Sequence, residues 1–320
     1  MVLTTEKEFP QAFLDRLTRI VPPGMFREIR ETMEGPRAVG FRVNRLRPEP
    51  EAVVAQLDIP VTPLPWVSFG FLCAPEDRWK LLESPAFLNG DIWVQNPSSM
   101  VPPVVLDPDP ADKVLDLAAS PGSKTLQLAE MMGHGADIAA VELSRSRFYR
   151  LKRNLRTHEA AFVKTFNRDG IKVQRYRPGH FDKVLIDAPC STEGQMRTDA
   201  PNSFSHWSPR KVKTMAGKQR LLLESAINCA KAGGVVVYST CSFAPEENEA
   251  VIQHALDTFG SAITIEPIGL DLPTRTPALR EWEGQTFDPR ISRTVRVLPD
   301  TEFEAFFVCR FRKLEHTHPF

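Results

Sequence analysis

The stretch VLDLAASPGSK, Val114 to Lys124, decides the fold of this 320-residue chain. It begins as an apolar run, turns through small residues and then starts an amphipathic run, which predicts a strand, a turn and a helix. Small residues let the backbone approach a ligand, and the free N–H groups at the start of a helix bind anions. The stretch therefore predicts a nucleotide-type cofactor site at the edge of a sheet.

Strand and helix patterns alternate downstream of this turn. The expected strands are VLDLAA, DIAAVEL, AFVKTFN, DKVLIDAP and GVVVYST, and the amphipathic stretches between or after them include 145–156, 219–231 and 246–259. This alternation predicts an α/β fold with a doubly wound, mostly parallel sheet. After residue 262 the runs TIEPI, TVRVL and AFFVCRF are expected to close the sheet.

The first 89 residues follow a different pattern. Helical spacing covers 9–19, a second helix is expected after Pro23, and short strand-like runs broken by prolines follow, 53–57 among them. Such a mixture is typical of a compact α+β unit. We therefore expect two domains, an N-terminal accessory domain at 1–89 and a catalytic domain at 90–320.

The composition of the chain limits its possible partners and its cellular compartment. The chain has 40 basic and 40 acidic side chains, so a nucleic-acid surface must be a local patch. Five cysteines, an odd number, do not fit a disulfide framework. Residues 1–17 lack the continuous apolar core of a signal peptide, and no run reaches the ~18 apolar residues of a membrane span. We expect a soluble, cytoplasmic protein without a membrane partner.

The turn favours S-adenosylmethionine over NAD as the cofactor. It lacks G-x-G-x-x-G, and a lysine near a helix N-terminus suits a carboxylate better than a pyrophosphate. Glu142, at the end of the next strand, is the ribose candidate, and Asp169, after the third strand, would lie beside the adenine. The alternatives are a helix-capping role for Glu142 and a turn role for Asp169. The turn residues expected to bind the cofactor are Ala118, Ala119, Ser120, Pro121, Gly122, Ser123 and Lys124.

Two cysteines each follow a predicted strand, Cys190 in DAPCS and Cys241 in STCS. Neighbouring strands lie roughly 5 Å apart, so both thiols are expected to flank one crevice. Cytosine C5 accepts a methyl group only after a thiolate adds at C6, and this predicts a covalent methyl-transfer enzyme. Asp187 is placed to hydrogen-bond the base as charge develops. The remaining cysteines are expected to be buried apolar residues: Cys73, Cys229 and Cys309.

Basic residues are concentrated in two segments. The first runs from Arg145 to Arg177, and the second runs from Arg210 to Arg220, with Phe204, His206 and Trp207 nearby. Cations beside aromatic rings suit phosphate contacts and base stacking, although a solvated helix face is the alternative. A cytosine that reaches a buried thiol must be unpaired or flipped out of its stack.

At these residues the chain resembles the RsmB/RsmF and NOP2/NSUN family of RNA cytosine-C5 methyltransferases. The resemblance covers most of the chain and implies a Rossmann-like class I methyltransferase domain that uses S-adenosylmethionine, preceded by an RRM-like, RNA-binding module. The motifs that carry it are RVN (42–44), QNPSSMVPP (95–103), DLAASPGSKT, DAPCSTEG, HWSP (206–209), YSTCSFAPEENE and AFFVCRF.

The resemblance also implies residue roles. Cys241 would attack C6, Cys190 would assist product release, and the cofactor contacts would extend to Asp187 and Arg147. Two departures are a serine-containing turn, where many members have alanine and glycine, and the lack of an evident C-terminal RNA-binding extension. The second departure leaves substrate choice to the N-terminal module.

Two other interpretations stay open. A catalytically silent module could keep the fold and bind S-adenosylmethionine and RNA without chemistry. The thiol roles could also be exchanged, with Cys190 attacking as in DNA cytosine methylases. We expect rRNA or tRNA as the partner, no metal and a monomeric protein.

Overall fold

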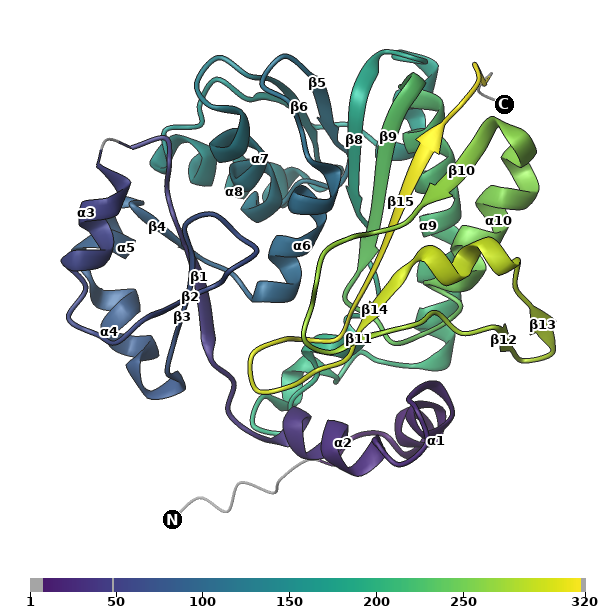
Figure 1. Cartoon of the computed structure of the whole chain (residues 1–320), viewed down its shortest axis with the longest axis horizontal. Coiled ribbons are helices and arrows are strands. Elements are labelled where there is room, and N and C mark those ends of the chain that lie inside the picture. The colour runs from purple at the N-terminus through teal and green to yellow at the C-terminus, as the bar shows by residue number, and fades with distance from the viewer. Residues whose placement is uncertain (1–7, 48, 318–320) are drawn as a thin grey trace.

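The computed structural model describes residues 8–47 and 49–317, so the first seven residues of the predicted N-terminal stretch and the last three of the chain lie outside it. Two sheets organise the chain. A nine-stranded sheet fills the right of Figure 1 and a four-stranded sheet lies at its left. No helix in these described ranges has the length and apolar character needed to cross a membrane.

The larger sheet has the order β11-β14-β15-β9-β8-β5-β6-β7, and β10 pairs with β15. Its parallel strands are β5 (Lys113–Asp116), β6 (Asp137–Val141), β7 (Lys164–Phe166), β8 (Phe181–Asp187) and β9 (Ala230–Thr240). Its antiparallel strands are β10 (Ile263–Glu266), β11 (Arg275–Thr276), β14 (Val295–Val297) and β15 (Phe306–Lys313). A hairpin of β12 (Glu281–Trp282) and β13 (Gln285–Thr286) stands apart. The predicted doubly wound, mostly parallel sheet is confirmed.

Helices cover both faces of this sheet. The helices on one face are α6 (Pro97–Leu106), α7 (Ser123–Met132) and α8 (Arg145–Thr157), and those on the other are α9 (Pro209–Cys229) and α10 (Glu249–Phe259). Successive residues of β8 point to opposite faces, so Ile186 packs into the core beneath α9, whereas Leu185 packs into the core beneath α7. Burial of the central parallel strands β5, β6, β8 and β9 explains their apolar runs, whereas the edge strand β7 is largely exposed.

Two boundary predictions were wrong for local reasons. Residues 53–57 do not form a strand, because α3 (Pro50–Ala55) begins on a proline that suits the first turn of a helix. Helix α9 begins ten residues before the predicted start, because Ser208 accepts the Lys211 N–H as an N-cap and Pro209 follows it. Between β7 and β8 the chain forms only the 3₁₀ segment η2 (Gly170–Arg175).

The smaller sheet is antiparallel, with the order β2-β3-β1-β4. Its strands are β1 (Val39–Val43), β2 (Thr62–Pro63), β3 (Gly70–Cys73) and β4 (Ile92–Val94), and α4 (Arg78–Glu83) and α5 (Pro85–Asn89) lie between β3 and β4. Because β4 follows residue 89, this sheet extends past the expected end of the accessory domain. The division into 1–89 and 90–320 stays a prediction.

The first two helices lie against the larger sheet and not in the four-stranded unit. They are α1 (Gln11–Ile20) and α2 (Phe26–Glu34), at the bottom of Figure 1. Phe13 of α1 is buried in one core with Trp207 and Phe243, and its ring centroid lies 5.6 Å from that of Trp207. Helix α1 therefore packs beside the loops that follow β8 and β9.

Arg42 and Asn44 of the RVN motif join the two sheets. Arg42 is 1% exposed, forms an ion pair with Glu130 of α7 and donates to the Ser123 carbonyl over 3.1 Å. Asn44 donates to the His158 carbonyl, which follows α8, over 3.1 Å. The four-stranded unit is thus bonded to α7 and to the residue that follows α8.

Candidate active site

The thiols of Cys190 and Cys241 lie next to each other. Strands β8 and β9 are parallel neighbours with Asp187 opposite Ser239, and each cysteine follows its strand. Their Sγ atoms are 3.3 Å apart, and the Gly194 N–H donates to the Cys241 carbonyl over 2.9 Å. The two thiols therefore lie together at the carboxyl ends of neighbouring strands, as expected, and the crevice between them stays a prediction.

Cys241 is held in its neutral form. The hydrogen bond to Cys190 and the burial of the sulfur raise the pKa of Cys241 well above its usual range, and the charge of Asp187 adds to this effect. A thiolate is the reactive form of cysteine, so Cys241 must lose a proton before it can attack. The remaining three cysteines, Cys73, Cys229 and Cys309, are buried in apolar cores as expected.

Asp187 connects the cysteine loops to the predicted cofactor turn. Its carboxylate accepts from Lys124 Nζ over 2.7 Å and from Ser239 Oγ over 2.8 Å, while about a third of the side chain stays exposed. Lys124 also donates to Ser99 Oγ over 2.6 Å. Lys124, predicted to face a cofactor carboxylate, is therefore engaged by protein groups.

The turn 118–124 lies between β5 and α7 and is fastened to α8. Ser120 Oγ donates to the Arg147 carbonyl over 2.9 Å, and the Arg147 guanidinium donates back to the Ser120 carbonyl over 2.6 Å. Gly122 has φ +113°, and a Cβ there would come within 3.1 Å of Leu151 Cδ1. The first N–H groups of α7 are free of intrahelical acceptors, as at any helix start.

The two acids predicted to contact the cofactor also make local contacts. Glu142 is 6% exposed, accepts the Ser144 N–H over 2.8 Å and lies 3.4 Å from the Arg147 guanidinium. Asp169 accepts the Ile171 N–H over 3.1 Å and caps η2. The alternative turn role of Asp169 thus occurs, whereas Glu142 bonds the residue before α8 and does not cap that helix, and the cofactor contacts of both acids stay predictions.

These groups fit the shape and chemistry of S-adenosylmethionine. A carboxylate stands at the end of β6, a second one follows β7, and the glycine turn with its helix N-terminus follows β5. Carboxylates with unused lone pairs suit ribose or adenine donors, and a helix N-terminus suits a carboxylate-bearing tail. In residues 8–47 and 49–317 no group of three or more His, Cys, Asp or Glu is placed to hold a metal ion.

A groove of about 760 Å³ runs along the face of β6 and β7 that η2 leaves partly open. Asp169 is the one predicted site residue that lines it, together with Val141, Phe166 and Tyr176, and neither Cys190 nor Cys241 does. The groove therefore adjoins the adenine end of the predicted cofactor site and lies apart from the thiols.

The predicted RNA surfaces are only partly as expected. The basic run from Arg145 to Arg177 divides between α8 and η2, which pack against opposite faces of the sheet, so it is not one cationic face. Phe204 and Trp207 are buried and cannot stack on a base, whereas His206 is exposed. The aromatic residues lie beside lysines in the sequence, which predicts stacking on RNA bases. In the structure their rings pack against α1.

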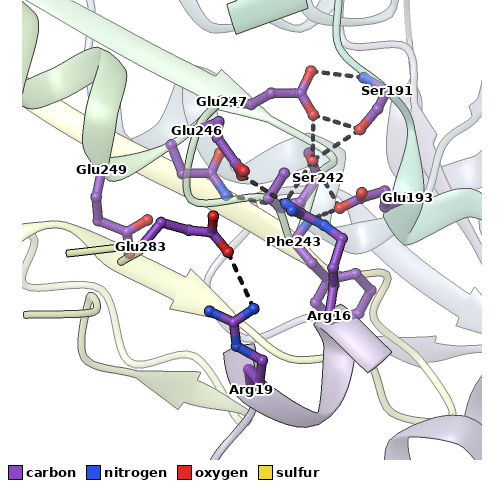
Figure 2. Close-up of polar contacts among 12 residues, drawn as sticks. Arg16, Arg19, Ser191, Glu193, Ser242, Phe243, Glu246, Glu247, Glu249 and Glu283 are labelled. Carbon is purple, nitrogen blue, oxygen red and sulfur yellow. Dashed lines mark hydrogen bonds and ion pairs between the residues drawn. The ribbon is translucent and has the colours of Figure 1, made fainter. Parts of the chain in front are cut away.

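Sequence reasoning missed four polar residues behind the thiols, which Figure 2 shows as a hydrogen-bonded cluster: Ser191, Glu193, Ser242 and Glu247. All four are at most 2% exposed. One feature of the sequence points to them, because both site cysteines are followed by serine.

The sheet order defines the Rossmann-like fold of class I methyltransferases. The family model described as 16S rRNA methyltransferase RsmB/F matches residues 103–312, and this chain belongs to that family.

Two curated relatives are named for different RNAs. The ribosomal RNA small subunit methyltransferase F of Aliivibrio fischeri (strain ATCC 700601 / ES114) is 35% identical over 97% of this chain and 65% of its own length. The tRNA (cytosine(49)-C(5))-methyltransferase of Pyrococcus abyssi is 36% identical over 87% of this chain and 89% of its own length. The chain therefore spans about two thirds of the first relative's length and most of the second's.

Solved structures share the fold. A methyltransferase homolog protein from Pyrococcus horikoshii has a TM-score of 0.82 at 34% identity, with 96% of each chain covered. NSun6 from Pyrococcus horikoshii, solved with SFG, has a TM-score of 0.81 at 20% identity over 96% of this chain and 99% of its own. The second likeness shows the fold alone.

Proposed function

We propose that this chain methylates C5 of a cytosine in RNA, with S-adenosylmethionine as the methyl donor. The observation that carries the proposal is the pair of thiols, 3.3 Å apart beside Asp187, in a member of the RsmB/F family. The relatives are named for rRNA and for tRNA at nearly equal identity, so both RNAs are candidate substrates. A cytoplasmic location and a monomeric state stay predictions.

Cys241 is proposed as the nucleophile. After it gives up its proton, its sulfur bonds to C6 of the cytosine, and the electron pair of the C5–C6 bond becomes available at C5. S-adenosylmethionine supplies an electrophilic methyl group to that carbon. Loss of the C5 proton then lets the C6–sulfur bond break, which restores the aromatic ring and Cys241.

Cys190 and Asp187 are proposed to serve the same base from the neighbouring strand. Cys190 lies against Cys241, and this proximity supports a role in release of the methylated product. Asp187 is partly exposed and held by Lys124 and Ser239, so its carboxyl group has a fixed position. An acceptor held in this way can take a hydrogen bond from the exocyclic amine of the cytosine, which would orient the ring for addition of the sulfur.

The remaining proposed contacts surround this centre. We propose that the turn 118–124, Glu142, Arg147 and Asp169 hold the cofactor, and that the four-stranded unit and the basic residues from Arg210 to Arg220 contact RNA. Contacts to phosphate would make RNA binding weaken steeply with salt.

Incubation with S-adenosylmethionine and separate rRNA and tRNA fractions, followed by mass spectrometry of the nucleosides, tests the function. We expect 5-methylcytidine in one fraction, its loss in Cys241→Ser, and its retention in the matched variant Cys229→Ser, which changes a buried thiol at the end of α9. Binding of S-adenosylmethionine without 5-methylcytidine in either fraction would support the silent module instead.

A further inference from the structure

Behind the thiols, each of the two cysteine loops contributes a carboxyl group that accepts a hydrogen bond from the other loop. Glu247, from the loop after β9, accepts the Ser191 N–H of the other loop over 2.8 Å. Glu193, from the loop after β8, accepts the Phe243 N–H of the opposite loop over 3.1 Å. Each loop is thus held through a carboxyl group that belongs to its neighbour, as Figure 2 shows.

The hydroxyl groups of the serines that follow the cysteines add further hydrogen bonds between the two loops. Ser191 Oγ and Ser242 Oγ are 3.0 Å apart, and both contact the same oxygen of Glu247, the second over 2.6 Å. Ser242 Oγ also lies 3.1 Å from Glu193. Because each serine directly follows a cysteine, the bonds that fix the serines also limit the positions of Cys190 and Cys241.

Further elements hold the two carboxyl groups in place. Gln219 of α9 donates to Glu247 over 3.0 Å and to the Pro189 carbonyl over 2.9 Å. The Trp207 indole N–H donates to Glu193 over 2.8 Å. The cluster is therefore anchored to α9 and to the segment that precedes it, outside both loops.

The cluster has fewer hydroxyl hydrogens than close oxygen–oxygen contacts, and a retained proton would supply part of the difference. The two serine hydroxyls supply two hydrogens for four oxygen–oxygen contacts among Ser191, Ser242, Glu193 and Glu247. Burial, and then the charge of Glu247, raises the pKa of Glu193 to about 7, and burial also raises the pKa of Glu247. Within the described ranges neither carboxylate has an ion-pair partner within 4.0 Å, so a retained proton lowers the cost of burial.

We propose that Glu247, with Glu193, is a positioning residue that sets the separation of the Cys190 and Cys241 thiols by tying together the serines that follow them. The catalytic meaning of this separation rests on the proposed function, but the separation itself does not. A base held between a nucleophile and a second group needs both within tenths of an ångström of their working positions.

The ease of disulfide formation between Cys190 and Cys241 measures their separation without any methylation. In glutathione redox buffers the fraction of this disulfide, read by alkylation and peptide mass mapping, gives the effective concentration of one thiol at the other. We expect Glu247→Ala to lower that effective concentration by roughly tenfold or more. Glu247→Gln is expected to lower it less, because an amide keeps the acceptor for the Ser191 N–H.

Two controls separate position from stability. Glu246→Gln changes the preceding glutamate, which pairs with Arg16 over 2.7 Å, and should leave the thiol pair unchanged. Ile227→Ala opens a cavity in the buried part of α9 and should lower stability while leaving the effective concentration unchanged. If Glu247→Ala does not fold by circular dichroism, the Ser191→Ala/Ser242→Ala double variant takes its place, because it removes both hydroxyl contacts to Glu247.

A folded Glu247→Ala, or the double variant, with the wild-type effective concentration would overturn the proposal. If the chain also methylates RNA, Glu247→Ala should lower kcat with little change in KM for RNA or S-adenosylmethionine. Absence of methylation in the wild type would refute the proposed function alone, since the thiol measurement would still report on Glu247.

Discussion

The loops that carry Cys190 and Cys241 differ sharply from the loops after β6 and β7. The serines and glutamates behind the thiols are at most 2% exposed and bonded across both loops, whereas Leu143, just after β6, is 66% exposed and Phe166 of β7 is 45% exposed. In the proposed chemistry the thiols need one fixed separation. The proposed cofactor would have to enter and leave in every cycle, and a more open rim would allow that exchange.

The largest expected effect comes from breaking the ion pair between Lys124 and Asp187, which joins the cysteine side of the site to the turn after β5. Lys124→Met leaves Asp187 without its cation and should lower kcat about a hundredfold, because the carboxylate loses its fixed direction. Methyl transfer under saturating substrates measures it. Lys183→Met, which changes a lysine at the other end of β8 that bonds the Asp107 carbonyl, should retain kcat. Equal losses in both variants would refute a special role for Lys124.

The next effect concerns the pH dependence of stability. Native Glu193 has a pKa of about 7 against 4.5 when exposed, so between these values the folded state binds more protons than the unfolded state. This group therefore makes the protein less stable as pH rises from 4.5 to 7, by on the order of 3 kcal/mol. Glu193→Gln cannot titrate and should remove that part of the slope in urea unfolding followed at several pH values.

The amide should also lower stability at every pH, because one of its two ends must meet a mismatched neighbour, either the Trp207 N–H or the Phe243 N–H. An unchanged pH slope in Glu193→Gln would contradict this account, because it would show that folding does not change the pKa of Glu193.

Much of this organisation follows from local sequence, and the rest depends on distant contacts. The alternation of strands and helices can be predicted because each has its own hydrophobic period along the chain. The turn at Gly122 can be predicted because small residues interrupt that pattern. The Ser191–Glu247 bond spans 56 residues and the Lys124–Asp187 pair spans 63, so no local pattern indicates either. For the same reason the sequence predicts a cofactor contact for Lys124, which stays a prediction, and does not predict its pair with Asp187.

Substitution of Gly122 tests the backbone conformation of the predicted cofactor turn. Gly122→Ala places a side chain at φ +113° and 3.1 Å from Leu151, so it should reduce the free energy of unfolding by about 1–2 kcal/mol and weaken S-adenosylmethionine binding. Gly217→Ala, on the exposed surface of α9 with nothing within 4 Å of the added carbon, should be neutral or stabilising by up to about 1 kcal/mol. Urea unfolding of both variants gives the comparison.

The smallest effect is expected at Leu143. Its exposed side chain follows Glu142 at the carboxyl end of β6, where a bound adenine would cover it. Leu143→Asn should weaken S-adenosylmethionine binding by about 1 kcal/mol, or about fivefold, by calorimetry and leave stability nearly unchanged. Leu221→Asn, at an exposed leucine of α9, should change neither, and an effect of equal size there would remove the argument for an adenine contact.

The division of roles between the two thiols is the central claim. Denaturing gels of the enzyme mixed with substrate RNA and S-adenosylmethionine test it directly, because a covalent protein–RNA adduct survives denaturation. Cys190→Ala should accumulate the adduct, since attack by Cys241 proceeds and release is impaired, and Cys241→Ala should form none. An adduct in Cys241→Ala and none in Cys190→Ala would contradict the account and make Cys190 the nucleophile.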